Sequence, residues 1–206
     1  DELKERFEPF VNMKDVVGIA IATRPDCLSD EICDYLEQLS HRCDLYIELG
    51  LQTVHDKTAQ LIHRGHDYQT FLDGLQRLRQ RHLDVCVHII NGLPYETYDM
   101  MLETAKQVGQ LDIQGLKIHN LYMLKDTALH RLYQQRPFEM LTREQYISLV
   151  VDQLQYIPAH VVIERLTGDA PIDDLVAPLW SIKKVTILND IDKLMKEKDT
   201  HQGYLL

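Results

Sequence analysis

The chain has 206 residues, 45% hydrophobic and 26% charged, which is typical of one packed domain and excludes a disordered, collagen-like or membrane-spanning chain. Its formal net charge of −10 disfavours a surface that grips a nucleic-acid backbone along its whole length, or one that binds an anionic membrane. The sequence does not start with a basic stretch followed by an apolar one, so no signal peptide is predicted. The four cysteines form no C-x2-C pair, which indicates reduced thiols. We therefore expect a cytoplasmic protein.

Short apolar runs alternate with helical patterns along the chain. The first run, 16–22, is continuously apolar, which favours a strand buried on both faces of a parallel sheet. Ser29, Asp67 and Thr142 stand where helix N-caps are expected, and Gln145 completes a capping box with Thr142. Further strands are predicted over 45–51, 85–90, 115–121 and 161–166, and helices over 29–42, 55–64, 67–81, 96–110, 127–135, 143–156 and 180–198.

This order of elements predicts an α/β fold. Strand-to-helix steps repeated in one direction require parallel strands joined by right-handed crossovers. Five strands are fewer than a complete eight-fold barrel needs, so we expect a partial (β/α) TIM-type barrel in one domain. Residues 15–170 would hold the β/α repeats, and 171–206 would form a C-terminal helical extension. An open doubly wound sheet is the alternative, although no G-x-G-x-x-G follows the first strand.

Polar side chains gather where the predicted strands end, and parallel α/β sheets carry their chemistry at that edge. Arg24 offers a guanidinium fork for a carboxylate or phosphate. Glu48 stands in an apolar strand, where it serves a site or pairs with Lys117 or Arg165. Gly92 would let a ligand approach the backbone closely. The candidates at the strand ends are Thr23, Arg24, Asp26, Glu48, Gln52, Thr53, His88, Asn91, His119, Asn120, Glu164, Arg165 and Thr167.

One alternative from these residues is a divalent-metal-dependent barrel hydrolase or lyase. Its ligands would be Glu48, His88, His119 and Glu164 at the strand mouths. The H-x-x-H string at 63–66 lacks two further ligands and does not predict zinc. The chain contains no H-E-x-x-H, no G-x-S-x-G and no phosphate-loop motif.

Seven segments, taken in order, resemble the radical SAM superfamily. The resemblance is to the branch with an Elongator-catalytic-subunit-like core, and especially to uncharacterised YhcC-type proteins, and it covers almost the whole chain. The segments are 21–26 (IATRPD), 48–53 (ELGLQT), 62–67 (IHRGHD), 88–97 (HIINGLPYET), 117–121 (KIHNL), 165–169 (RLTGD) and 177–181 (APLWS).

The resemblance implies an enzyme that uses S-adenosylmethionine and a [4Fe–4S] cluster. In that family a C-x3-C-x2-C-like motif holds the cluster, which cleaves the cofactor reductively to a 5′-deoxyadenosyl radical. The four cysteines of this chain have other spacings, and the family's first two barrel strands are absent. We therefore expect the rear portion of a longer enzyme, inactive by itself.

The resemblance also implies roles for residues at the rear of the cofactor site. Gln52 would contact the ribose of S-adenosylmethionine, Arg64 its carboxylate or ribose, and the 91–94 backbone its adenine. Ala22 departs from the Glu that many relatives have there. The cofactor-binding residues implied are Thr23, Arg24, Gln52, Arg64, His88, Asn91, Gly92 and Pro94. The substrate-side candidates are Glu48, Lys117, His119 and Glu164.

The substrate stays open at this stage. The resemblance implies tRNA or a small molecule, and the acidic composition favours tRNA less. A non-catalytic interaction fragment is a further alternative. It would self-associate through an exposed strand edge at 16–22.

Overall fold

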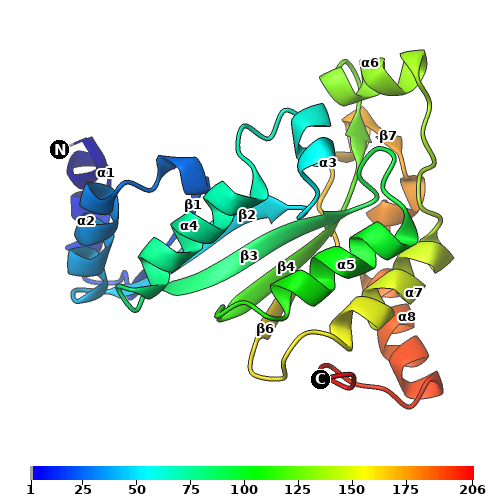
Figure 1. The fold of residues 1–206 in the computed structure, drawn as a ribbon. Helices are drawn as coiled ribbons and strands as arrows, with labels where there is room; N and C mark the ends of the chain where they lie inside the picture. Colours follow the sequence, from blue (N-terminus) through cyan, green and yellow to red (C-terminus); the bar gives the residue numbers. More distant parts are fainter. Residues whose placement is uncertain (1) are drawn as a thin grey trace.

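The computed structural model describes residues 2–206, in which strands and helices alternate along most of the chain (Figure 1). The strands are β1 (Gly18–Thr23), β2 (Asp44–Gln52), β3 (Asp84–Asn91), β4 (Gly115–Asn120), β5 (Met123–Leu124), β6 (Val162–Arg165) and β7 (Leu175–Ala177). The helices are α1 (Glu2–Val11), α2 (Asp30–Ser40), α3 (Asp56–Leu61), α4 (Tyr68–Arg79), α5 (Tyr98–Val108), α6 (Ala128–Gln135), α7 (Arg143–Leu154) and α8 (Lys184–Glu197).

A single parallel sheet organises the fold. Its strand order is β1-β2-β3-β4-β6, and every neighbouring pair is parallel. The predicted α/β architecture is therefore confirmed. A second pairing, between β5 and β7, is antiparallel and was not predicted. It places a strand, β7, inside the 171–206 segment.

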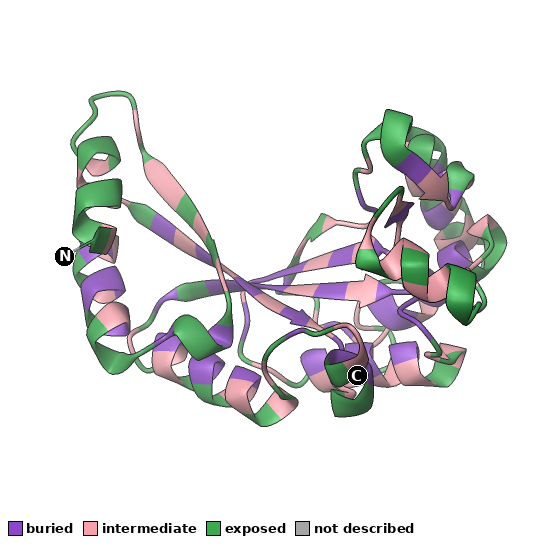
Figure 2. Cartoon of the chain, turned by 90° about the horizontal axis from the view of Figure 1, so that it is seen from above, coloured by how far each residue is buried: buried purple, intermediate pink, exposed green. Residues whose placement is uncertain are grey.

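The two faces of the sheet differ in what covers them. Along β2, Leu45, Ile47, Leu49 and Leu51 are buried, whereas the alternate residues are partly exposed. Figure 2 shows helices gathered along one side of the sheet, and the buried positions alternate along its strands. The other side is named the open face here. By register it carries Tyr46, Glu48 and Gly50 of β2, Cys86 and His88 of β3, and Gly115, Lys117 and His119 of β4.

The helix starts follow the predicted caps. Ser29 accepts a hydrogen bond from the Ile32 amide at 3.3 Å, and Asp67 accepts one from the Thr70 amide at 2.8 Å. The Thr142 capping box forms as predicted. Each cap satisfies an amide that the first helical turn leaves without a partner.

Two predictions about elements were wrong. β1 is an edge strand with exposed Ala20 and Ala22, so it is not buried on both faces. The last helix begins at Lys184, not at Trp180. Trp180 lies in a 3-10 turn, because its indole donates to the Leu141 carbonyl at 2.9 Å and packs on the core.

Among the described residues, 2–206, no helix is both long and apolar enough to cross a membrane.

The helix-facing side of the sheet should carry most of the packing energy. Leu116 of β4 is 0% exposed there, whereas Val162 of β6 is 60% exposed. We expect Leu116→Ala to lower the free energy of unfolding by about 2–5 kcal/mol, because it opens a cavity in a packed core. Val162→Ala should cost less than about 0.5 kcal/mol. Urea unfolding of both variants measures this difference, and equal losses would contradict the assignment of the two faces.

Candidate functional site

A row of charged and polar side chains crosses the open face, named here the polar strip and made of Glu48, His88, Lys117, His119 and Glu164. The Lys117 ammonium lies 2.6 Å from Glu48 Oε1 and 3.4 Å from Glu164 Oε2. His88 Nε2 lies 2.9 Å from Glu48 Oε2. The His88 and His119 rings lie beside each other, tilted by 31°, with their centroids 5.2 Å apart. Four of the sequence candidates therefore come together with His88 on one face.

Partial burial and mutual charge set the protonation of the strip. Burial opposes the ionisation of Glu48, but Lys117 and His88 outweigh it and keep the Glu48 pKa below its ordinary value. Burial likewise opposes the charge on Lys117, but Glu48 raises the Lys117 pKa above its ordinary value.

The two histidines respond in the opposite sense. Burial lowers the His88 pKa despite the neighbouring Glu48. It lowers the His119 pKa to about 4, with further lowering by His88, Arg165 and Lys117. At neutral pH the strip therefore presents one ammonium, ionised Glu48 and two neutral imidazoles.

Gln52 ends β2 at the upper edge of this face. Its φ of 63° is left-handed, an uncommon conformation for a residue with a side chain. The side-chain amide folds back over Gly50, since a Cβ built on Gly50 would lie 2.9 Å from Gln52 Nε2. Gly50 pairs in register with His88, so Gln52 and His88 belong to adjacent parts of the open face.

Arg64 lies away from that face, in the loop after α3. Its guanidinium donates to the backbone carbonyls of Leu51 at 2.6 Å and His66 at 2.9 Å, and also to that of Thr53. Its side chain is 3% exposed, and burial lowers its pKa. In this structure Arg64 fixes the end of β2 against the next loop.

The 91–94 segment, which follows β3, is buried. The Asn91 and Gln153 side-chain amides form two hydrogen bonds with each other, at 2.7 and 2.9 Å. Gly92 has a φ of 87°, and its amide donates to Met101 Sδ at 3.0 Å. Pro94 is also buried. Internal contacts therefore fix this turn, and the Asn91 side-chain amide is already paired with Gln153.

Thr23 and Arg24 end β1. Thr23 Oγ1 lies 3.4 Å from the Arg24 carbonyl oxygen, and Arg24 Nε donates to Asp26 Oδ1 at 2.9 Å. The guanidinium rests against Gly65, where a Cβ would stand 2.6 Å from Nη2. The exposed Arg24 guanidinium therefore lies at the carboxyl end of β1 and is already paired with Asp26.

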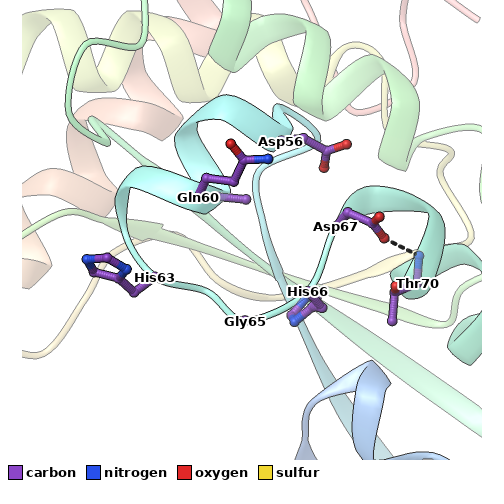
Figure 3. Close-up of a pocket in the computed structure, with 8 residues that line it drawn as sticks. Asp56, Gln60, His63, Gly65, His66, Asp67 and Thr70 are labelled. Atoms are coloured by element: carbon purple, nitrogen blue, oxygen red, sulfur yellow. Dashed lines mark hydrogen bonds between the residues drawn. The ribbon is translucent and has the colours of Figure 1, made fainter.

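A cavity of about 560 Å³ opens beside this loop, between α3 and α4 (Figure 3). His63 and His66 line it on either side of Gly65, and their rings do not converge. The His66 side chain is 1% exposed and lies 3.9 Å from Asp26. The H-x-x-H string therefore does not bring its two imidazoles to one point.

Within residues 2–206, no three His, Cys, Asp or Glu side chains converge as metal ligands. The metal alternative would need a metal ion between Glu48 and Glu164, but the Lys117 ammonium lies there. The residues named for a metal-dependent hydrolase thus form an ion-paired strip. The four cysteines are free thiols spread over the fold, with Cys33 and Cys86 buried and Cys27 exposed.

Two residues of this region were missed from the sequence. The Thr53 hydroxyl donates to Glu96 Oε1 at 2.6 Å, and burial raises the Glu96 pKa. Tyr46 lies two residues before Glu48 on the same face. The period of two along β2 was the signal that could have identified Tyr46.

Comparison with known proteins gives matches along most of the chain. The family model described as the radical SAM superfamily matches residues 2–108, and the radical SAM C-terminal domain matches 113–197. YtqA of Bacillus subtilis, an uncharacterised protein, is 48% identical over 98% of this chain and 62% of its own length. YhcC of Escherichia coli K12 is 32% identical over 95% of this chain and 63% of its own length. The chain thus spans less than two thirds of these relatives.

A solved structure shares the fold. The Methanocaldococcus infernus Elp3 with an N-terminal deletion aligns with a TM-score of 0.82 and 22% identity, over 97% of this chain and 46% of that one. A tRNA uridine(34) acetyltransferase of the same archaeon is 25% identical over 88% of this chain and 34% of its own length.

Burial of neutral His119 predicts a pH dependence of stability. The His119 pKa falls from 6.5 to about 4 on folding, so the unfolded chain takes up a proton that the folded chain refuses. The contribution of this group to stability is present above pH 6.5 and is lost as the pH drops toward 4, by about 3 kcal/mol. Urea unfolding between pH 7 and pH 4.5 should show a shallower fall for His119→Gln. The exposed His160→Gln serves as the control, and an identical fall in both variants would contradict the assignment.

Proposed function

The chain belongs to the radical SAM superfamily, and from that premise we propose that it forms the rear wall of the active site in a radical S-adenosylmethionine enzyme. A [4Fe–4S] cluster bound in the complete protein would supply the electron for the reductive cleavage of S-adenosylmethionine to a 5′-deoxyadenosyl radical. This chain would supply contacts to the cofactor and to the substrate. The carrying observation is that the polar strip and Gln52 share one open face of a parallel sheet.

The cluster does not fit the residues of this chain. Cys33 lies on α2 and Cys86 on β3, both buried, and within 2–206 no set of three metal-ligating side chains converges. The cluster ligands would therefore come from a segment outside this sequence. By itself the chain is expected to form no cluster and to cleave no S-adenosylmethionine.

The S-adenosylmethionine contacts fit better. The Gln52 amide lies free of the helix-facing core and over Gly50, where no Cβ competes with it. His88 stands in register with Gly50, and the buried 91–94 turn ends the adjacent strand. Gln52 would hydrogen-bond the ribose hydroxyls, and the 91–94 backbone would lie along the adenine. Thr23 and Arg24 would close the rim.

Arg64 and Asn91 would act indirectly. The Arg64 donors already hold the carbonyls of Leu51, Thr53 and His66. The Asn91 amide is paired with Gln153. Both would fix the shape of the turns that meet the cofactor, a supporting role on which site geometry depends.

The substrate would lie along the polar strip, against Glu48, Lys117, His119 and Glu164. Neutral imidazoles and a paired ammonium offer hydrogen bonds without a large uncompensated charge. This arrangement suits an uncharged polar group of a small molecule or of a nucleobase. The relative described as a tRNA uridine(34) acetyltransferase supports tRNA as the larger substrate. We also propose a cytoplasmic location, since the four cysteines are free thiols.

The first test loads the complete protein. Anaerobic reconstitution with iron and sulfide should give a brown, oxygen-sensitive protein that forms 5′-deoxyadenosine from S-adenosylmethionine under dithionite. Gln52→Ala should weaken S-adenosylmethionine binding about tenfold by calorimetry, the effect of one lost hydrogen bond. Gln110→Ala, an exposed residue after α5, is the matched control. A colourless protein that yields no 5′-deoxyadenosine would reject the proposal.

A further inference from the structure

Tyr46 reaches across the open face from β2 toward the far strands. On the far side of β2 from β1, the sheet continues with β3, then β4 and then β6. A Cβ built on Gly115 of β4 would stand 2.0 Å from the Tyr46 hydroxyl and 2.7 Å from Glu164 Oε1. The phenol therefore passes over β3 and ends above Gly115, at the side chain of Glu164 in β6.

The absence of a side chain at Gly115 makes this crossing feasible. No real Cβ approaches another heavy atom to 2.0 Å, so any larger residue would displace the phenol or the carboxylate. The Cys86 Cβ lies 3.3 Å from the same point and closes the space from β3. Cys86 is 0% exposed, consistent with a cover formed by the Tyr46 ring.

The Tyr46 hydroxyl and Glu164 Oε1 both lie against the same point above Gly115, which places the phenol to donate toward the Glu164 carboxylate. Burial and this carboxylate both raise the Tyr46 pKa far above its ordinary value, so the phenol keeps its proton and remains a donor. The other Glu164 oxygen, Oε2, lies 3.4 Å from the Lys117 ammonium. Glu164 is thus held from two sides, by a donor from β2 and a cation from β4.

We infer that Tyr46 is a positioning residue of the open face, which crosses β3 and ends above Gly115 of β4 to fix Glu164 against Lys117. It also forms the lower boundary of the polar strip, because its ring covers the face between Cys86 and Glu164. This inference rests on the proposed function only in treating Glu164 as a substrate-side residue. It deepens that proposal by naming the residue that sets where the strip ends.

A double-mutant cycle in the complete protein, without cofactor, tests the crossing. Gly115→Ala alone should be strongly destabilising because its methyl meets the Tyr46 hydroxyl. In the Tyr46→Phe background the hydroxyl is gone, and the effect on the unfolding equilibrium constant should shrink on the order of tenfold. Tyr35→Phe is the control background, since the Tyr35 hydroxyl is also buried but lies on α2. There the effect of Gly115→Ala should be unchanged.

NMR of the side-chain carboxyl groups tests the positioning itself. A merely structural role of Tyr46 would leave the Glu164 carboxyl resonance unmoved. In Tyr46→Phe the Glu164 side-chain carboxyl resonance should shift, whereas that of exposed Glu197 on α8 should not. In Glu164→Gln the Tyr46 pKa, followed by its ring-carbon resonance, should fall.

An equal effect of Gly115→Ala in both backgrounds, or an unmoved Glu164 resonance, would overturn the inference. If Gly115→Ala does not fold, the double variant decides: recovery of folding supports the crossing, and continued failure contradicts it. None of these measurements uses S-adenosylmethionine. Their failure is therefore separate from a failure to form 5′-deoxyadenosine.

Discussion

Lys117 stands between two carboxylates that arrive from opposite sides of its strand. Glu48 comes from β2 and Glu164 from β6, at 2.6 Å and 3.4 Å from the ammonium. The Lys117 side chain is only 13% exposed, so its charge needs these partners in order to remain in the fold. These three side chains thus link β2, β4 and β6 across the intervening β3 on the open face.

Other features of the open face follow from that link. Glu48 is drawn toward Lys117 with one oxygen and holds His88 with the other. The His88 ring in turn lies beside the tilted ring of His119, which burial keeps neutral. Toward the strand mouths, Gln52 takes the left-handed conformation and brings its amide over Gly50. The face is therefore polar along its length while carrying few free charges, a surface suited to holding a reactive intermediate away from ionised groups and bulk water.

Local patterns in the sequence predicted what depends on local chemistry. Ser29, Asp67 and Thr142 cap helices because a side-chain oxygen three residues upstream meets a free amide wherever a helix starts. The repeated strand-to-helix steps predicted a parallel sheet, and every neighbouring pair of its five strands is parallel. A charge in an apolar strand needs a partner, which predicts that Glu48 either serves a site or pairs with Lys117 or Arg165, and the structure pairs it with Lys117.

Features that depend on tertiary contacts could not be predicted from local patterns in the sequence. Arg64 stood in a string typical of cofactor contact, yet its guanidinium holds three backbone carbonyls that only the folded loop brings together. Tyr46 stands between Leu45 and Ile47 in the predicted strand over 45–51, and no local pattern there indicates a partner on another strand. Its role became visible only through Gly115, some seventy positions along the chain, whose missing side chain leaves room for the phenol. β1 looked buried because apolar composition does not reveal which strand lies at an edge.

The most direct measurement of this account is the coupling between Glu48 and Lys117 in urea unfolding at pH 7. Glu48→Gln and Lys117→Met should each cost about 3 kcal/mol, because each leaves a mostly buried charge without its partner. The double variant should cost much less than the sum of the two. Additive losses would show that the two side chains do not depend on each other, and would contradict a face organised around this ion pair.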